Sequence, residues 1–266
     1  MRVPRALNPR IKKRLLKKFG VYDKVAPVET TPIRHVPEHI ERPNYLSKGK
    51  QIMVPTMPEI KDVNQVRGMR RSCKLASTIL GQLNNFIKPG VTTDDIDEFI
   101  HKLVIEAGAY PSPLHYKGFT KSICTSVNNV VVHGIPDIRP LEDSDIVNVD
   151  ITAIRSCGPD VPFREIGARI QRHAKSKGLT VIPAVIGHGI GNYFHGPPDI
   201  YHIRNKYPGV MKPGMTFTIE PVLTHGTENV VLLEDCWTVI TEDGSRAAQV
   251  EHTVLITDDG VEILTH

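Results

Sequence analysis

The sequence predicts an α+β fold, in which helices and mostly antiparallel strands are mixed along the chain. In the first half, two stretches repeat apolar residues at the three- and four-residue spacing of a buried helix face. Further along, stretches rich in β-branched residues are bounded by glycine, proline, asparagine or aspartate, which is typical of strands and turns. The strands do not alternate regularly with helices, and this disfavours a parallel doubly wound sheet.

The first 20 residues form a basic segment that we predict to be a transit peptide. They carry eight Lys or Arg side chains and no acid, and Ile11, Leu15 and Phe19 recur every four residues. A basic amphipathic helix of this kind is typical of mitochondrial targeting, so we expect a mitochondrial protein. The alternative is a solvated basic tail on a cytoplasmic protein, which the absence of serine from the segment favours.

The rest of the chain is weakly acidic. Beyond residue 20, 25 of the 33 Lys and Arg residues remain, against all 29 Asp and Glu residues, so we expect no nucleic-acid partner. No apolar run approaches the roughly 18 residues of a membrane span, so we expect no membrane partner, and we also expect a monomer. The four cysteines lack CxxC spacing, which disfavours a disulfide framework and fits a reducing compartment.

Residues 21–60 contain six prolines. Proline at this density resists helix formation and favours extended chain. We therefore predict a proline-rich extended arm over residues 21–60, which lies over a single domain formed by residues 61–266.

Three helices are predicted within that domain. The first spans residues 62–87 and is stopped by a Pro-Gly pair. The second begins at Thr92, where Asp95 is placed to complete a capping box. The third covers residues 162–178, because a proline opens it and a glycine closes it.

The strands are predicted from alternation and from the turn residues between them. Two of them flank an Asn-Asn pair, and an Asp-Gly pair predicts a hairpin near the end of the chain. The predicted strands cover residues 122–127, 130–133, 146–154, 181–186 and 215–223, with a hairpin that pairs 236–241 with 247–257.

Three strands place a carboxylate, Asp150, Glu220 or Glu251, on a polar face amid strong strand formers. For any one strand, a face wetted by solvent is the simpler interpretation. Carboxylates, however, are rarely buried unless they are paired or bound to metal. His188 and His133 each lie where a strand runs into glycine, and together with the carboxylates they favour a metal site. One imidazole with several carboxylates suits manganese, iron, cobalt or zinc.

Five motifs identify a resemblance. CTSVNNVVVHGIP, VNVDIT, GHGIGNYFH, TFTIEP and AAQVEHTVLIT resemble successive signatures of type I methionine aminopeptidases, in the same order. The arm sequence PEHIERPNYL looks like that of the mitochondrial form of this family. The resemblance implies a pita-bread fold, in which two similar αβ halves surround a curved antiparallel sheet and a two-metal site lies between them. It makes residues 61–266 a metallo-aminopeptidase domain.

The resemblance also implies roles for individual residues. It assigns metal ligation to Asp150, His188, Glu220 and Glu251, and substrate contact to His133 and His195. It assigns the methionine pocket to five apolar or sulfur-bearing residues, of which some could equally be ordinary core: Tyr116, Phe119, Cys124, Phe194 and Trp237. Such a lining suits a thioether side chain. In this scheme two divalent cations hold a water, Glu220 accepts its proton, and His195 and His133 stabilise the oxyanion or hold the substrate amide.

The sequence departs from the family pattern after Ile154. The resemblance implies a second strand there, whose Gly-Asp-Thr motif supplies a metal-bridging aspartate, and then a long helix. A few tens of residues, this aspartate included, have no counterpart in the chain. Asp160 does not replace it, because Pro159 and Pro162 on either side exclude a central strand, and we predict Asp160 to be a turn residue. We therefore expect an incomplete N-terminal half and one tightly bound metal.

The expected function is metal-dependent removal of the initiator methionine from nascent proteins, with a small second residue preferred. The alternative is a catalytically impaired pita-bread isoform that binds peptides or partners without efficient turnover. An Xaa-Pro or creatinase-type peptidase is weaker, because such enzymes carry a separate N-terminal domain for which 60 residues of tail and arm leave no room.

Overall fold

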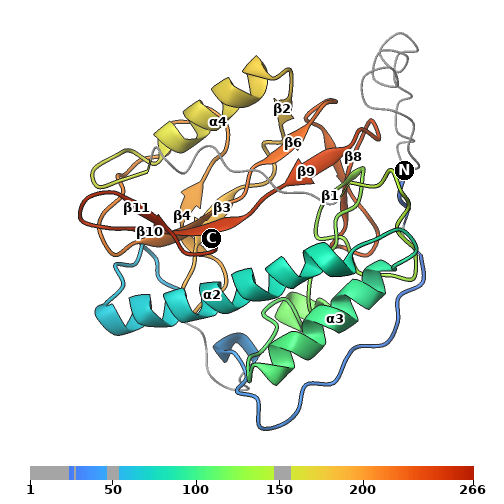
Figure 1. Cartoon of the computed structure of the whole chain (residues 1–266). Helices are drawn as coiled ribbons and strands as arrows, with labels where there is room; N and C mark the ends of the chain where they lie inside the picture. Colours follow the sequence, from blue (N-terminus) through green and yellow to red (C-terminus); the bar gives the residue numbers. More distant parts are fainter. Residues whose placement is uncertain (1–23, 27, 47–53, 147–156) are drawn as a thin grey trace.

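The computed structural model describes residues 24–26, 28–46, 54–146 and 157–266 (Figure 1). The predicted basic segment over residues 1–20 and the strand predicted over 146–154 with its Asp150 therefore lie almost wholly outside the described residues. Within them, none of the helices has the length and apolar character required to cross a membrane.

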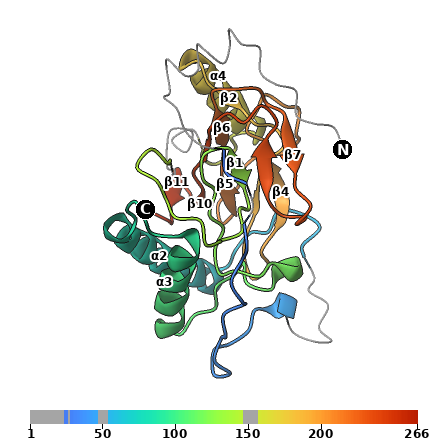
Figure 2. The same ribbon diagram turned by 90° about the vertical axis from the view of Figure 1, so that its right-hand side faces the viewer.

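Two helices lie together on one side of the strands (Figures 1 and 2). Helix α2 (Val63–Phe86) begins at Asp62, whose carboxylate accepts hydrogen bonds from two backbone N–H groups of the first turn. Helix α3 (Thr93–Glu106) begins at Thr92 and has the capping box with Asp95 that the sequence predicted. The two pack through a cluster that includes Ile79, Ile96 and Ile100, and both helix predictions are confirmed.

Helix α4 (Arg164–Ser176) lies on the other side of the strands from α2 and α3 (Figure 2). It buries Ile166, Ile170 and Ala174 against a core that includes Phe217 of the large sheet, and its position confirms the third predicted helix. Two short 3-10 turns, η1 (Asn44–Leu46) and η2 (Tyr116–Gly118), complete the helical elements among the described residues.

The strands of the described residues form three sheets, and every pairing is antiparallel, as expected. The five-stranded sheet has the order β11 (Val261–Ile263), β10 (His252–Ile256), β5 (Thr216–Ile219), β3 (Gly187–Gly189) and β4 (Gly196–Ile200). One three-stranded sheet has the order β1 (Val130–Val132), β8 (Val239–Thr241) and β7 (Val230–Leu232). The other has the order β2 (Thr180–Val181), β6 (Val222–Thr224) and β9 (Ala247–Gln249).

The strand predicted over residues 122–127 is wrong. Only β1, on the other side of the Asn-Asn turn, is a strand. The backbone N–H groups of Ser122 and Ile123 donate to the Asp97 carboxylate of α3, at 2.7 and 3.1 Å. The Asp97 side chain therefore accepts the two N–H hydrogen bonds that carbonyl groups of a neighbouring strand would otherwise have accepted.

Two strands predicted as continuous are broken at prolines. The stretch 181–186 ends at a turn that contains Pro183, so that β2 and β3 belong to different sheets. The stretch 215–223 is interrupted at Glu220 and Pro221, so that β5 and β6 also belong to different sheets. Proline has no N–H to donate, and in both places the chain leaves one sheet and enters another.

The predicted hairpin between residues 236–241 and 247–257 is also wrong. The Asp243-Gly244 turn is present, with φ +70° at Gly244, but β8 pairs with β1 and β7 while β9 pairs with β6. The N–H groups on either side of the turn donate to the Asn-Asn turn, from Thr241 to Asn129 O at 2.9 Å and from Ala247 to Asn128 O at 2.7 Å. This turn thus joins two sheets.

Asp160 lies in a turn with φ +62°, and its N–H donates to Met211 O at 2.9 Å. The prediction that Asp160 is a turn residue is confirmed.

Candidate metal centre

Two carboxylates lie where the chain passes between sheets. Glu220 follows β5 and precedes β6, and Glu251 lies between β9 and β10. Since β10 pairs with β5 so that His252 faces Ile219, the two carboxylates that adjoin these residues become neighbours. His188 lies in β3, which pairs with the other edge of β5.

His188, Glu220 and Glu251 each offer a ligand atom, and these atoms all lie within 4.8 Å of one another. The structure thus brings together three of the four predicted metal ligands, and the fourth, Asp150, lies outside the described residues. The predicted polar face of β5 is not wetted, because Thr216 and Thr218 are at most 2% exposed and Glu220 is 8% exposed. This result excludes the solvent-facing interpretation for that strand.

Hydrogen bonds orient the ligand atoms. The Thr218 hydroxyl donates to Glu220 Oε1 at 2.8 Å and accepts the backbone N–H of His188 at 2.9 Å, so one residue fixes both. Gln249 Nε2 donates to the other oxygen of Glu220 at 3.0 Å. His188 Nδ1 lies 3.1 Å from the carbonyl oxygen of Gly189 and can donate to it, which leaves Nε2 free to bind a metal.

The glycines beside His188 are required by the neighbouring backbone. A Cβ atom on Gly187 would lie 2.2 Å from Thr218 O, and one on Gly189 would lie 1.9 Å from Pro197 O. Both distances are far inside van der Waals contact. The GHG sequence therefore lets β3 approach its neighbours closely enough to hold the imidazole beside Glu220.

The electrostatics of the group favour a bound cation. Burial, and then the charge of Glu251, raises the pKa of Glu220 to about 9. Glu251 is exposed, yet desolvation by the neighbouring protein raises its pKa to about 6. Burial lowers the pKa of His188, so the imidazole is neutral and ready to act as a ligand. A divalent cation would relieve the repulsion between the carboxylates, and the donor set fits such an ion.

The residues predicted for substrate contact lie in two ring clusters. In one, Tyr116 packs edge-on against Phe194 at 4.8 Å between centroids, and its hydroxyl hydrogen-bonds His195 Nδ1 at 2.9 Å. The His195 ring is 4.1 Å from that of His188, which attaches this cluster to the metal ligands. Burial, with the neighbouring His188 adding, lowers the pKa of His195 to about 3.

In the second cluster, the Trp237 ring packs edge-on against Phe119 at 5.0 Å and against His133 at 5.9 Å. His133 takes a left-handed backbone conformation, with φ +56°, directly after β1. The thiol of Cys124 is solvent-accessible yet crowded by protein, and desolvation together with the nearby Glu251 charge raises its pKa to about 12. The first cluster thus adjoins the metal ligands through His195, and the second lies within electrostatic reach of Glu251 at Cys124.

His202 belongs to the same site, and the sequence did not indicate it. It is 1% exposed, and its Nε2 lies 3.2 Å from the backbone N–H of Glu220, which donates to it. Its Nδ1 lies 3.1 Å from Val185 O, and burial lowers the pKa of His202 to about 4, so the ring is neutral. Glu220 lies just after β5 and is followed by a proline, where the strand pairing is interrupted. The His202 ring accepts the hydrogen bond from the Glu220 N–H at this point. No local pattern in the sequence marks this role.

The chain is similar to known metallopeptidases. The model of metallopeptidase family M24 matches residues 67–156 and 151–258. Methionine aminopeptidase 1D, mitochondrial, from Danio rerio is 47% identical over 277 residues, covering 91% of this chain and 82% of the relative. The human protein of the same name is 40% identical and covers 91% of this chain and 83% of the relative.

Solved structures show the same fold. The crystal structure of methionine aminopeptidase from Rickettsia prowazekii is 35% identical with a TM-score of 0.75, covering 79% of this chain and all of that one. A prolidase from Pyrococcus horikoshii shares the fold at 17% identity and a TM-score of 0.56. The expected α+β pita-bread fold is therefore confirmed. From the sequence and structural relatives together, the chain belongs to the methionine aminopeptidases of metallopeptidase family M24.

Proposed function

We propose that this chain removes the initiator methionine from nascent proteins by metal-dependent hydrolysis of the first peptide bond. The observation that carries the proposal is the group His188, Glu220 and Glu251, with the first ring cluster attached to it at His188. The relatives that bear the name methionine aminopeptidase support it. They do not favour the alternative of an impaired isoform that binds peptides without efficient turnover.

His188, Glu220 and Glu251 would hold the metal, together with Asp150. When bound, a divalent cation supplies Lewis acidity, which makes water nucleophilic near neutral pH. Glu220 acts as the general base, because its carboxylate is held by Thr218 and Gln249 beside the other ligands and accepts the proton of the attacking water. The water oxygen bonds to the carbonyl carbon of the first peptide bond, the bond from that carbon to nitrogen breaks, and Glu220 gives the proton to the leaving amine.

His195 is the donor for the substrate carbonyl or amide. It is neutral, and when its Nδ1 accepts the Tyr116 hydroxyl, its proton lies on Nε2. A neutral donor of this kind stabilises developing oxyanion charge without itself adding charge to the site. His133, at the end of β1 beside Trp237, contacts the substrate from the second cluster.

We infer that one metal binds tightly. The described residues supply three ligands, which is the number found in working mononuclear sites. The alignments with relatives support the inference that this chain is shorter than they are near residue 154. The 277-residue alignment with the Danio rerio protein takes in 91% of this chain, about 242 residues, and the family match divides in two around residues 151–156. Manganese, iron, cobalt and zinc all suit the donor set.

The pocket residues predict specificity for methionine with a small second residue. We expect the metal-loaded chain to cleave Met-Ala-Ser at least tenfold faster than Leu-Ala-Ser. Phe119, Phe194 and Trp237 offer an aromatic pocket that suits the unbranched side chain of methionine and its polarisable thioether. The measurement is kcat/KM for both peptides. Equal kcat/KM values for the two peptides would contradict the assignment of these residues to a methionine pocket. The proposal that the chain is an aminopeptidase would still stand.

We place the protein in mitochondria and assign the targeting function to residues 1–20. The segment carries eight cations and no acid, and relatives of 40 to 47% identity bear mitochondrial names. We expect these 20 residues to direct a fused fluorescent reporter to mitochondria, and a variant with Arg5, Arg14 and Lys18 changed to Gln to lose that targeting. A diffuse reporter signal with the unaltered segment would contradict the assignment.

The remaining expectations are a monomeric state and the absence of nucleic-acid and membrane partners. They stay part of this proposal, and light scattering of the purified protein tests the first of them.

A further inference from the structure

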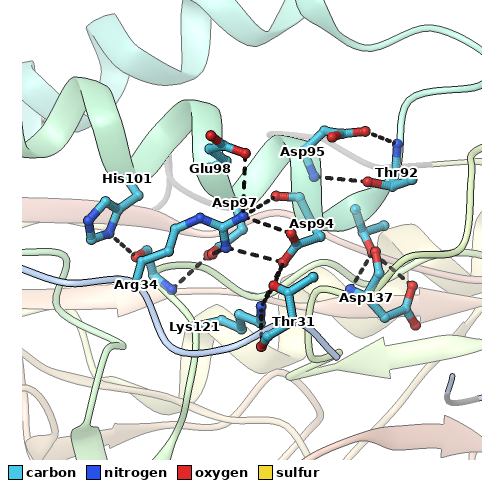
Figure 3. A network of polar contacts seen from close by, with 12 residues as sticks. Thr31, Arg34, Thr92, Asp94, Asp95, Asp97, Glu98, His101, Lys121 and Asp137 are labelled. Carbon is cyan, nitrogen blue, oxygen red and sulfur yellow. Dashed lines mark hydrogen bonds and ion pairs between the residues drawn. The ribbon is translucent and has the colours of Figure 1, made fainter. Parts of the chain in front are cut away.

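The arm is fixed to α3 by a network of charged groups (Figure 3). The Arg34 guanidinium bonds Asp94 at 2.7 Å and Asp97 at 2.5 Å. Lys121, whose side chain is fully buried, bonds Asp94 from the other side at 2.6 Å and the Thr31 hydroxyl at 2.6 Å. Two cations thus enclose one carboxylate, and both ends of this part of the arm are held against the domain.

The arm then turns and packs on the loop that carries Tyr116, one of the residues predicted to line the methionine pocket. Arg42 closes the turn by donating to Val36 O at 2.7 Å and to Ile40 O at 3.2 Å. The side chains of Val36 and Ile40 are buried together with Leu114, which lies two residues before Tyr116. These contacts bring η1 and its Tyr45 to the predicted methionine pocket.

The ring of Tyr45 contacts two predicted pocket residues. Its centroid lies 5.2 Å from that of Tyr116, edge-on, and 6.3 Å from that of Phe194, stacked. The Tyr45 hydroxyl donates to the carbonyl oxygen of Ser112, so the phenol bridges both ends of the loop 112–116. Burial raises the pKa of this hydroxyl, so it remains a donor at neutral pH.

The loop that Tyr45 supports has a strained backbone. His115 and Lys117, on either side of Tyr116, are non-glycine residues with φ of +65° and +47°. Such conformations persist where surrounding contacts hold them. The Tyr116 hydroxyl hydrogen-bonds His195, and Tyr45 contacts the ring of the same tyrosine.

We propose that Tyr45 is a positioning residue of the substrate site, which holds Tyr116 and Phe194 in place and makes the arm part of the methionine pocket. This inference rests on the proposed function, since it needs these two residues to line the pocket. Arg34, Lys121 and Arg42 serve the same purpose indirectly, because they anchor the segment that carries Tyr45. The arm thereby sets the affinity for the substrate and its selectivity, while the hydrolytic step depends on the metal ligands.

The test compares Tyr45→Ala with Tyr45→Phe in the full metal-loaded chain. Tyr45→Ala should raise KM for Met-Ala-Ser about five- to tenfold, the size of a lost aromatic pair, with kcat changed less than twofold. It should also reduce the preference for methionine over leucine. Tyr45→Phe keeps the ring and should restore most of the wild-type KM. Ile33→Ala, an exposed residue of the same arm, is the matched control and should change neither constant.

Calorimetry with the product L-methionine supplies a readout that does not need turnover, and thermal unfolding with metal content shows that each variant is folded. Weaker methionine binding by folded, metal-loaded Tyr45→Ala supports the inference. An unchanged Kd, KM and methionine preference in that variant would overturn it and leave the proposed function intact. Wild-type chain that neither cleaves Met-Ala-Ser nor binds methionine would overturn the proposed function and the inference with it.

Discussion

Glu220→Gln should reduce the turnover of Met-Ala-Ser by about 10³-fold or more, within the range for loss of a general base and with weaker metal binding adding to it. The side chains have nearly the same shape. A glutamine can still accept from Gln249 with its carbonyl oxygen and donate to Thr218 with its amide, so the fold around β5 should persist. It cannot accept a proton from water. The measurement is kcat/KM together with the thermal unfolding midpoint.

Glu228→Gln is the matched control for this experiment. Glu228 is exposed in the loop between β6 and β7, and its substitution should leave turnover unchanged. A Glu220→Gln variant that is folded and keeps more than a tenth of wild-type turnover would contradict the role of Glu220 as the base.

The second large effect concerns the number of metal ions. After loading with Mn²⁺ or Co²⁺ and exhaustive dialysis, the wild-type chain should retain one equivalent of metal. His188→Ala should retain almost none, because the two described carboxylates that remain, Glu220 and Glu251, have raised pKa values and are partly protonated in the absence of a cation. Elemental analysis of both proteins measures this directly.

His173→Ala is the control for the histidine substitution. His173 is exposed on α4, and its substitution should leave the metal content at one equivalent. Two equivalents in the wild-type chain, retained through dialysis, would show that another group replaces the bridging aspartate that the family pattern places after Ile154.

The local features of this fold could be read from the sequence. The helices α2, α3 and α4 were predicted because their apolar spacing and their caps, such as Thr92 with Asp95, depend on residues a few positions apart. The choice of Glu220, Glu251 and His188 also came from local patterns, since several carboxylates among strand formers and histidines beside glycine together favoured a metal site. The motif resemblance supplied the family and the function.

The tertiary structure decided which strands pair and what supports the site. Alternation along a strand tells which residues share a face, but it does not tell which strand lies alongside, because that depends on hydrogen bonds to distant segments. The predicted hairpin failed for this reason, since both sides of its turn bond Asn128 and Asn129. The roles of His202 and Tyr45 arise in the same way. Each contacts residues that lie 18 or more positions away in the chain, Glu220 for His202, and Tyr116 and Phe194 for Tyr45, so that only the folded chain places them at the metal site and the pocket.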